Sequence, residues 1–551
     1  MSRSSGMSRV LVLVGLALLA AALWFWRPWD SSGRGWFTDT TRAAGIGFEH
    51  SSGRTGSHRY LEIVGGGVGM FDYDGDGWLD LYFVNGNHIA KPMSKSITNI
   101  LYRNNHDGTF TDVTAQAGVG DAGFGQGCCA ADFDNDGDQD LYVTNYGLDR
   151  FYRNNGDGTF SEVGKAVGVV CDSWGQSCAF FDADGDGWLD LYVQNYLTYA
   201  PAMEGKRADY NTPTAFKGAP DRLYLNKGDG TFRDVSVKSG LHRPDGRGMG
   251  VACVDFDGDG DLDLFVANDG MENYYFQNKG DATFEERSVR SGLAFNYDGA
   301  SESSMGVDVG DFDGDGQQDI ACPALRSECC TLYKNGNGLF DDVSRPSRLA
   351  PLTRPFTGFS PNWLDVDNDG DLDLFLCNGG VARNLDSSPQ QTYLEQYGVP
   401  DLLVLNDGQG RFAKAGPAPG AHFERALIGR GSAAGDLDND GDIDLVVCNL
   451  NGAPNILRND APQGHWLTLV LVPSKGHRDP IGAKIKVTAG GRSQTAVVRA
   501  SGGYLSLNDR RPHFGLGAAT TVERIEIVWP DGSQQVLTEA KADQILEIRQ
   551  T

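Results

Sequence analysis

The residues with the clearest chemical potential are aspartates that recur in a nine-residue pattern, D-x-D-x-D-G-x-x-D. Seven copies occur, each with aspartate at positions 1, 3, 5 and 9 and glycine at position 6. The aspartates of the successive copies are Asp72, Asp74, Asp76 and Asp80; Asp132, Asp134, Asp136 and Asp140; Asp182, Asp184, Asp186 and Asp190; Asp255, Asp257, Asp259 and Asp263; Asp311, Asp313, Asp315 and Asp319; Asp365, Asp367, Asp369 and Asp373; and Asp436, Asp438, Asp440 and Asp444. Chance does not produce seven copies with five fixed positions, so the pattern is an internal repeat.

This spacing predicts a cation site in each loop. Alternate residues of a tightly curled loop direct their carboxylates to one centre, as in the first half of an EF-hand, and glycine at position 6 permits the sharp turn. Four adjacent carboxylates repel one another unless a cation lies between them. An all-oxygen, flexible cage suits calcium better than magnesium, zinc or copper. The alternative, that the aspartates only form turns, does not explain the fixed spacing.

About seven Ca²⁺ ions are therefore expected, one in each loop. Seven divalent ions would change the formal net charge of the chain from −27 to −13.

Strand-like segments surround each loop and must position it. In the first copy, apolar residues 68–71 lead into the loop and the alternating residues 79–85 lead out of it. A second element, residues 101–104 followed by residues 107–110 (DGTF), contains an Asp-Gly turn and predicts a β-hairpin. One repeat is thus four short strands, and seven repeats predict an all-β, seven-bladed β-propeller.

The two ends of the repeat region predict how the ring closes. Residues 36–41 (WFTDTT) resemble the fourth strand of other repeats, such as 109–114 (TFTDVT), although no blade precedes them. The seventh repeat has the opposite defect, because no matching fourth strand follows Asn459. We therefore expect the first strand to complete the last blade.

Two insertions account for the longest spacings between loops. They lie near residues 197–220 and 381–400, each between the second and third strands of a blade. That connection leaves the blade on the face opposite the aspartate loops. Insertions on one face of a repeat array often mark a binding face, and simple drift in loop length is the alternative.

Composition changes after the repeats and suggests three regions. Residues 1–34 are predicted to be a signal peptide or signal anchor, 35–460 the propeller, and 461–551 a small all-β domain of its own. Residues 462–551 hold 11 Lys and Arg against 8 Asp and Glu, a balance of +3, so residues 1–461 carry −30. The acidic chain suits cations and argues against nucleic acid as a partner.

The N-terminus predicts an extracytoplasmic protein, in the periplasm or at the cell surface. Arg3 and Arg9 precede an apolar run, residues 10–26, which is typical of a secretory signal or a signal anchor. An uncleaved segment would anchor the chain in a membrane, and a cleaved one would release it.

Ten cysteines are compatible with an oxidising compartment. Cys171 with Cys178, and Cys322 with Cys329 or Cys330, are candidate local disulfides. Single cysteines within strand-like runs, Cys253, Cys377 and Cys448, are expected to be buried thiols.

The repeats resemble the VCBS/FG-GAP repeats of integrin α-chain propellers and of the cartilage acidic protein family, over roughly residues 36–460. The tail resembles an ASPIC/UnbV domain at 479–483 (DPIGA), 502–504 (GGY), 513–517 (HFGLG) and 529–532 (WPDG). The resemblance implies an extracellular or periplasmic calcium-binding protein that acts in adhesion or interaction.

No catalytic motif is evident in the sequence. It contains no GxSxG, HExxH or nucleotide-binding loop, and His513, which lies in a tail motif, is expected to be structural. We therefore expect a non-catalytic binding or adhesion module with an unidentified protein or glycan ligand. The alternative is an enzyme or assembly factor that acts on an extracytoplasmic polysaccharide or secondary metabolite.

Overall fold

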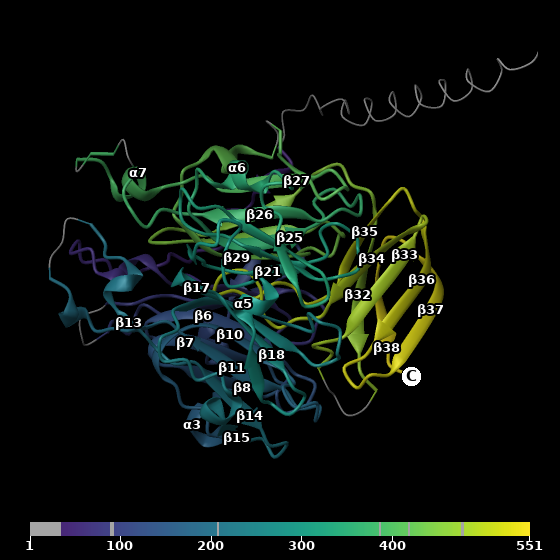
Figure 1. The fold of residues 1–551 in the computed structure, drawn as a ribbon, viewed down its shortest axis with the longest axis horizontal. Helices are drawn as coiled ribbons and strands as arrows, with labels where there is room; N and C mark the ends of the chain where they lie inside the picture. Colours follow the sequence, from purple (N-terminus) through teal and green to yellow (C-terminus); the bar gives the residue numbers. More distant parts are fainter. Residues whose placement is uncertain are drawn as a thin grey trace, which may run out of the picture. The chain divides into compact units, whose positions relative to one another are not determined.

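The computed structural model describes residues 35–88, 93–205, 209–384, 387–388, 390–416, 419–474 and 479–551. The predicted signal or anchor segment, residues 1–34, lies outside the described residues. Residues 36–551 form one compact unit that is built almost entirely of β-strands (Figure 1). Within the described ranges, no helix has the length and apolar character needed to span a bilayer.

Seven antiparallel groups of four strands follow one another along the chain, as the repeat pattern predicts. Blades 1 to 4 contain β2 (Val68–Phe71), β3 (Asp80–Phe83), β4 (Ile100–Asn104) and β5 (Phe110–Asp112); β6 (Gly125–Ala131), β7 (Asp140–Leu148), β8 (Arg150–Asn154) and β9 (Phe160–Glu162); β10 (Asp172–Phe181), β11 (Asp190–Asn195), β14 (Arg222–Asn226) and β15 (Phe232–Asp234); and β16 (Gly248–Val254), β17 (Asp263–Met271), β18 (Tyr274–Asn278) and β19 (Phe284–Glu286).

Blades 5 to 7 contain β21 (Asp308–Gly310), β22 (Asp319–Cys322), β23 (Thr331–Asn335) and β24 (Phe340–Asp342); β25 (Gly358–Leu364), β26 (Asp373–Asn378), β27 (Leu402–Asn406) and β28 (Phe412–Lys414); and β29 (Gly429–Gly435), β30 (Asp444–Asn449), β31 (Asn455–Asn459) and β1 (Phe37–Asp39). The described strands therefore form a seven-bladed β-propeller.

The first strand of the chain closes the ring, which confirms the expectation from the chain ends. β1 pairs antiparallel with β31, with Phe37 opposite Asn459 and Asp39 opposite Leu457. Phe37 is 3% exposed and its ring lies 5.8 Å from that of Phe423. Blade 7 is thus assembled from both ends of the repeat region.

Short helices connect the blades and fill the insertions. One-turn helices follow the fourth strands: α2 (Thr114–Ala117), α3 (Gly164–Val167), α4 (Ser236–Ser239), α5 (Ser288–Ser291) and α6 (Leu349–Thr353). η1 (Tyr60–Ile63) precedes blade 1, η4 (Ala421–Glu424) precedes blade 7, and β20 (Glu302–Ser303) pairs with β17.

Both insertions lie between second and third strands, as expected, and they contact each other. The first contains β12 (Leu197–Thr198), η2 (Pro201–Met203), η3 (Pro213–Ala215) and β13 (Lys217–Gly218), and the second contains α7 (Tyr393–Tyr397). The Tyr397 hydroxyl donates to Asp209 Oδ1 at 2.9 Å. The insertions of blades 3 and 6 therefore meet on the face opposite the acidic loops.

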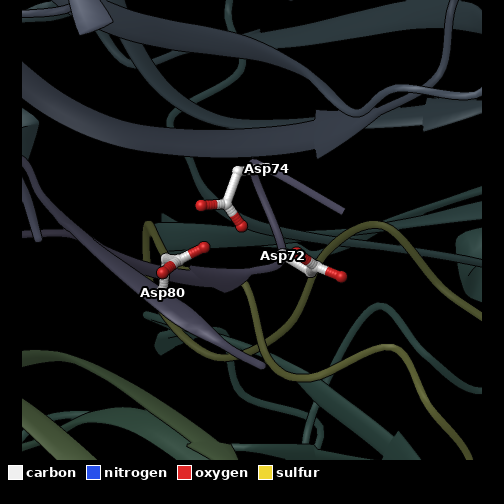
Figure 2. Close-up of side chains that lie close together, drawn as sticks. All are labelled: Asp72, Asp74 and Asp80. Atoms are coloured by element: carbon white, nitrogen blue, oxygen red, sulfur yellow. The ribbon is translucent and has the colours of Figure 1, made fainter. Parts of the chain in front are cut away.

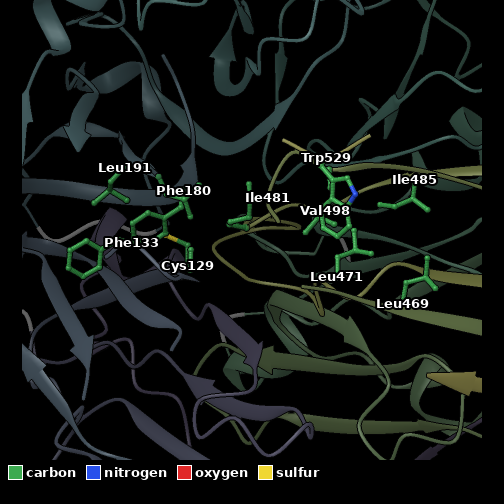
Figure 3. Close-up of a cluster of buried hydrophobic side chains, with 14 of the residues drawn as sticks. Cys129, Phe133, Phe180, Leu191, Leu469, Leu471, Ile481, Ile485, Val498 and Trp529 are labelled. Carbon is green, nitrogen blue, oxygen red and sulfur yellow. The ribbon is translucent and has the colours of Figure 1, made fainter. Parts of the chain in front are cut away.

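The C-terminal strands form two sheets of their own. One has the order β35 (His513–Gly517), β32 (His465–Val472), β38 (Gln544–Arg549), and the other the order β34 (Arg492–Val497), β33 (Lys484–Ala489), β36 (Thr521–Val528), β37 (Gln534–Lys541). Their core is continuous with that of blades 2 and 3: Ile481 and Trp529 belong to the same buried cluster as Phe133 and Phe180 (Figure 3). These strands and the propeller belong to one compact unit.

A loop from the C-terminal part occupies the middle of the ring. Leu507 exchanges backbone hydrogen bonds with the innermost strand of blade 1, and Gly503 accepts one from Val307 of blade 5 at 3.0 Å. Tyr504 is fully buried, with its ring 5.0 Å from that of Phe359 in blade 6. Gly503 has φ +68°, and a Cβ there would lie 2.3 Å from Ser360 Oγ, so glycine is required for this close approach.

The predicted local disulfides are wrong, because all ten cysteines carry free, buried thiols. Cys171 immediately precedes β10 and Cys178 lies within it, so seven residues of extended chain, roughly 23 Å, separate them. Cys322 pairs with Thr331, which places the neighbouring Cys330 on the other face of the sheet. The expectation of buried thiols at Cys253, Cys377 and Cys448 is confirmed.

Candidate metal centres

Each acidic loop links the first and second strands of its blade and gathers carboxylates. In loops 1 and 3 the aspartates at positions 1, 3 and 9 each place one oxygen within 4.8 Å of the others (Figure 2 shows Asp72, Asp74 and Asp80 of loop 1). In loops 2, 4 and 5 positions 1, 3 and 5 do so. These five groups have the composition and spacing of metal sites.

Position 1 organises the turn through backbone hydrogen bonds. Asp72 accepts from the N–H groups of Asp76 at 3.0 Å and Gly77 at 2.9 Å, and the equivalent pair of bonds recurs in loops 2, 5, 6 and 7. Gly77 has φ +86°, a conformation that side chains other than glycine rarely adopt. The fixed glycine at position 6 therefore lets the loop fold back on its first aspartate.

Position 9 fastens the loop to its blade. Asp80 accepts from the Tyr73 N–H within the loop at 3.1 Å and from the Asn104 N–H of the third strand at 2.8 Å. Equivalent pairs of bonds occur at the position-9 aspartates of the other six loops. This residue thus has a structural role in addition to the predicted role as a metal ligand.

Position 3 supplies the oxygens that most need a cation. Asp134, Asp184, Asp313 and Asp438, from loops 2, 3, 5 and 7, each have a buried Oδ1 with no hydrogen-bond donor. A buried carboxylate oxygen without a donor is costly, since it has lost its hydration and gained nothing in exchange. One metal ion in each of these four loops would give the Oδ1 atom the partner that it lacks.

Burial also raises the pKa of several loop carboxyls at positions 1 and 9. It raises the pKa of Asp80, Asp132 and Asp319 to about 8, and that of Asp263 and Asp436 to about 7. In loops 6 and 7 burial likewise raises the pKa of Asp373 and Asp444, and the charges of the neighbouring loop aspartates add to the effect. The loops thus concentrate carboxyls that ionise with difficulty without a cation.

An asparagine at the end of each third strand joins neighbouring loops, a role that the sequence analysis missed. Asn154 Nδ2 donates to the Gln139 carbonyl of its own loop at 3.1 Å and to the Tyr73 carbonyl of the preceding loop at 2.8 Å. Asn104 makes the same connection across the closure, to Leu437 O of loop 7 at 2.9 Å. The recurring motif that ends in Asn104, Asn154 and Asn226 was the available signal.

Loss of one of these asparagines should loosen the ring. Asn104→Ala removes donors to two buried carbonyls, so we expect a loss of about 2–4 kcal/mol of unfolding free energy. Asn105→Ala is the matched control, because its side chain bonds only to Thr109 and Thr111 of its own hairpin. Denaturant unfolding of the two variants checks this, and equal losses would contradict a role in joining blades.

The C-terminal part covers the loop face with polar and basic side chains. Lys484 pairs with Asp255 of loop 4 and Arg492 with Asp371 of loop 6. Thr495 Oγ1 donates to Asp311 of loop 5 at 2.8 Å, and Arg511 donates to the Asp436 carbonyl of loop 7 at 3.0 Å. The positive balance of residues 462–551 thus faces the acidic loops.

His513 lies on this interface in a structural position. Its Nε2 is 2.7 Å from Asn368 Oδ1 of loop 6 and its Nδ1 is 2.9 Å from Thr468 Oγ1. Burial, together with the nearby Arg511 charge, lowers the pKa of His513 to about 3. The imidazole is therefore neutral near pH 7, as a buried histidine with two hydrogen-bond partners should be.

The fold and the loops define a class, the β-propellers built from acidic-loop repeats. The chain matches the FG-GAP-like repeat model at residues 72–143, 132–193, 214–266 and 255–322, and the ASPIC and UnbV model at residues 473–551. These matches, together with relatives among the curated proteins, support assignment of the chain to the cartilage acidic protein-like family.

The similar curated proteins include cartilage acidic protein 1 of Mus musculus and of Homo sapiens. The mouse protein is 25% identical over 499 residues, which cover 88% of this chain and 64% of the relative. The human protein is 25% identical over 341 residues, which cover 60% of this chain and 48% of the relative. The chain thus spans about half to two thirds of the length of these relatives.

Solved structures with a similar fold share little sequence with this chain. A lectin from Agrocybe aegerita that recognises non-reducing terminal N-acetylglucosamine is 16% identical, with a TM-score of 0.37 over 71% of this chain and 86% of the lectin. YCF48 bound to a D1 peptide is 9% identical, with a TM-score of 0.39 over 72% of this chain and 93% of YCF48. Likenesses with TM-scores this low do not bear on function.

Proposed function

We propose that this chain is an extracytoplasmic, non-catalytic binding module whose seven acidic loops each hold one calcium ion. The observation that carries the proposal is the set of position-3 carboxylate oxygens, buried without a donor in four loops, beside two or more further carboxylates. Carboxylate oxygens in a flexible loop are the ligands that calcium prefers. The FG-GAP-like match supports the same assignment.

The ions would hold the loops in shape between the first two strands of every blade, while the opposite face binds a partner. In this proposal the partner is a protein or a glycan, and the apolar residues 10–26 direct the chain out of the cytoplasm as a cleaved signal or a membrane anchor. Membership of the cartilage acidic protein-like family supports a site of action outside the cytoplasm.

Two acids outside the loops, Asp149 and Asp221, have raised pKa values that do not favour the enzyme alternative. Burial raises the pKa of Asp149 to about 8 and that of Asp221 to about 7. Both carboxyls are fully buried, and each accepts from a tyrosine hydroxyl, Tyr142 at 2.8 Å and Tyr192 at 2.6 Å. These acids are structural parts of the blades.

Calorimetric titration of the metal-free chain with calcium tests the proposed sites. We expect saturable binding at all seven loops and much weaker binding of magnesium, which demands a more rigid octahedral site. Asp255→Ala with Asp257→Ala should remove one site, loosen blade 4 and leave the other six. Absence of calcium binding by the folded chain, or unchanged stoichiometry in this variant, would refute the assignment.

The raised pKa values also predict how pH acts on stability. Carboxyls with a raised pKa hold protons in the folded chain that the unfolded chain has lost, so the stability that they contribute is fully present below the unfolded pKa of about 4 and is lost progressively as pH rises to their folded pKa of about 7 to 8. Without calcium, the melting temperature should therefore fall as pH rises from about 4 to about 8, and these groups should add no further change above that pH.

With calcium bound, the fall of the melting temperature with rising pH should weaken or reverse. The ion binds ionised carboxylates, so its affinity rises over the same interval and protons are released on binding. Melting curves with calcium and with chelator, recorded across the interval, check this prediction. Parallel pH profiles under the two conditions would contradict it.

A further inference from the structure

A groove of about 720 Å³ lies on the face of the propeller opposite the acidic loops. Its walls are the segment that follows β1, the connection between β30 and β31 of blade 7, and α7 of the second insertion. In an up-and-down blade, the connection from the second to the third strand leaves on the face opposite the loop between the first and second strands. The connection from the fourth strand to the next blade leaves on that same opposite face. The groove therefore lies on the same face as the two insertions, and its size is typical of a ligand site.

The groove is basic although the chain as a whole carries −27. Three exposed arginines line it, Arg42, Arg54 and Arg425, and Asp39 is the one acidic residue among the described lining residues. Asp39 is already engaged, since it pairs with Arg425 at 3.3 Å and accepts from Asn455 Nδ2 at 2.8 Å. Arg42 and Arg54 are exposed at the groove, and among the described residues neither guanidinium group has a carboxylate within 4.0 Å.

The walls hold one of these cations in place and offer a second polar contact. The Arg54 guanidinium lies over the Tyr393 ring, 4.4 Å from its centroid. Asn449 is 4% exposed and lines the groove, and its Nδ2 donates to Ala453 O at 2.9 Å and to Asn455 Oδ1 at 2.8 Å. The Asn449 Oδ1, however, is buried with no donor. A ligand that donates a hydrogen bond would satisfy this oxygen.

Apolar contacts favour a peptide over a sugar. The Tyr393 ring has Arg54 on it and packs against Tyr397, with centroids 4.8 Å apart, so it offers little open surface for a pyranose ring to stack on. Leu394 is 45% exposed at the rim, and Ile428 and Leu450 form a buried apolar floor. Arginine and tyrosine are both enriched at protein-binding surfaces.

We propose that this groove binds an acidic peptide segment of a protein partner. Carboxylates of the peptide pair with Arg42 and Arg54, and an apolar side chain rests against Leu394. A backbone N–H of the peptide donates to Asn449 Oδ1. This assignment rests on the proposed binding function and specifies the partner class and the face that engages it.

Selection of random octapeptides on the immobilised full chain, in saturating calcium, tests the proposal. We expect enrichment of sequences that combine Asp or Glu with one large apolar residue. Because the chain is strongly acidic, non-specific adsorption would favour basic peptides. Enrichment of acidic peptides therefore cannot result from non-specific adsorption. Enrichment of basic sequences, or no enrichment, would overturn the proposal.

Substitutions in the groove test whether the selected peptides bind there. Arg42→Gln with Arg54→Gln should weaken the selected peptides at least roughly tenfold in fluorescence anisotropy, and binding should weaken with salt. Arg290→Gln with Arg524→Gln is the control, because it removes the same charge from exposed arginines on other elements. Equal effects of the two pairs would overturn the groove assignment, as would tighter binding of a hexamer of galacturonic acid than of the peptides.

Calcium calorimetry on the same samples keeps this proposal separate from that of the metal sites. Peptide selection that persists while calcium fails to bind would refute the calcium sites and retain the groove. Calcium binding without selection of acidic peptides would refute the groove and retain the calcium sites.

Discussion

Removing calcium from this chain should lower its melting temperature by about 15–20 °C. Each site that binds only the folded state adds about 2.7 kcal/mol when the ion is at a hundredfold excess over its Kd, so seven sites add about 19 kcal/mol. A cooperative unit of this size has an unfolding entropy of roughly 1 kcal/mol per kelvin, which converts that free energy into the stated shift. Differential scanning calorimetry with calcium and with chelator measures it.

The loops themselves explain why the effect should be large. Without an ion the folded chain carries buried carboxylate oxygens with no donor, such as those of Asp134 and Asp313, in addition to the mutual repulsion within each loop. Magnesium at the same concentration is the control and should restore only part of the stability. A melting curve that does not move when chelator replaces calcium would show that the loops are not structural calcium sites.

Deletion of residues 36–46 should destabilise the propeller far more than removal of a flexible terminal segment. β1 provides the outer strand of blade 7, and the Thr40 N–H donates to Ile456 O at 2.8 Å just beyond it. Phe37 is buried against Phe423, and burial of one phenylalanine alone is worth about 3–5 kcal/mol. Without this strand, β31 becomes an unpaired edge that favours aggregation.

A Gly-Ser replacement of residues 36–46 separates closure from tethering, since it keeps the chain length and removes the strand. We expect this variant to aggregate or to melt with a loss of at least about 5 kcal/mol, as the deletion does. Unfolding in denaturant and light scattering measure the two effects. Wild-type melting and calcium binding in the Gly-Ser variant would support a simple tether instead.

Ring closure was predictable because both of its partners carry the repeat pattern. The Phe-Thr-Asp segment of residues 37–39 recurs as residues 110–112, where it is the fourth strand of blade 1, and the missing fourth strand of blade 7 is visible as a gap in the same pattern. The loop aspartates were predictable for the same reason. The aspartates of one loop lie within nine residues of one another, so a single sequence shows their spacing directly.

The contacts between regions were not predictable, since their partners are far apart in sequence and have no period. Nothing in residues 499–512 signals that Tyr504 packs against Phe359 inside the ring, although Gly503 is one of the residues that the approach requires. The asparagine that joins two loops was visible as a repeated residue, but its acceptor lies in another repeat, 81 residues away for Asn154 and Tyr73. The disulfide prediction failed because proximity in sequence does not bring two residues of one extended strand together.

A crystal structure of the calcium-bound chain with anomalous scattering would locate the proposed ions. We expect seven anomalous peaks, one in each acidic loop. Each ion should be coordinated by the aspartates at positions 1, 3 and 5, and by the one at position 9 where it reaches the ion, at about 2.3–2.6 Å. The position-3 oxygens of Asp134, Asp184, Asp313 and Asp438 should be among the ligands. Ordered acidic loops without any anomalous peak, in crystals grown in saturating calcium, would show that the loops do not bind calcium.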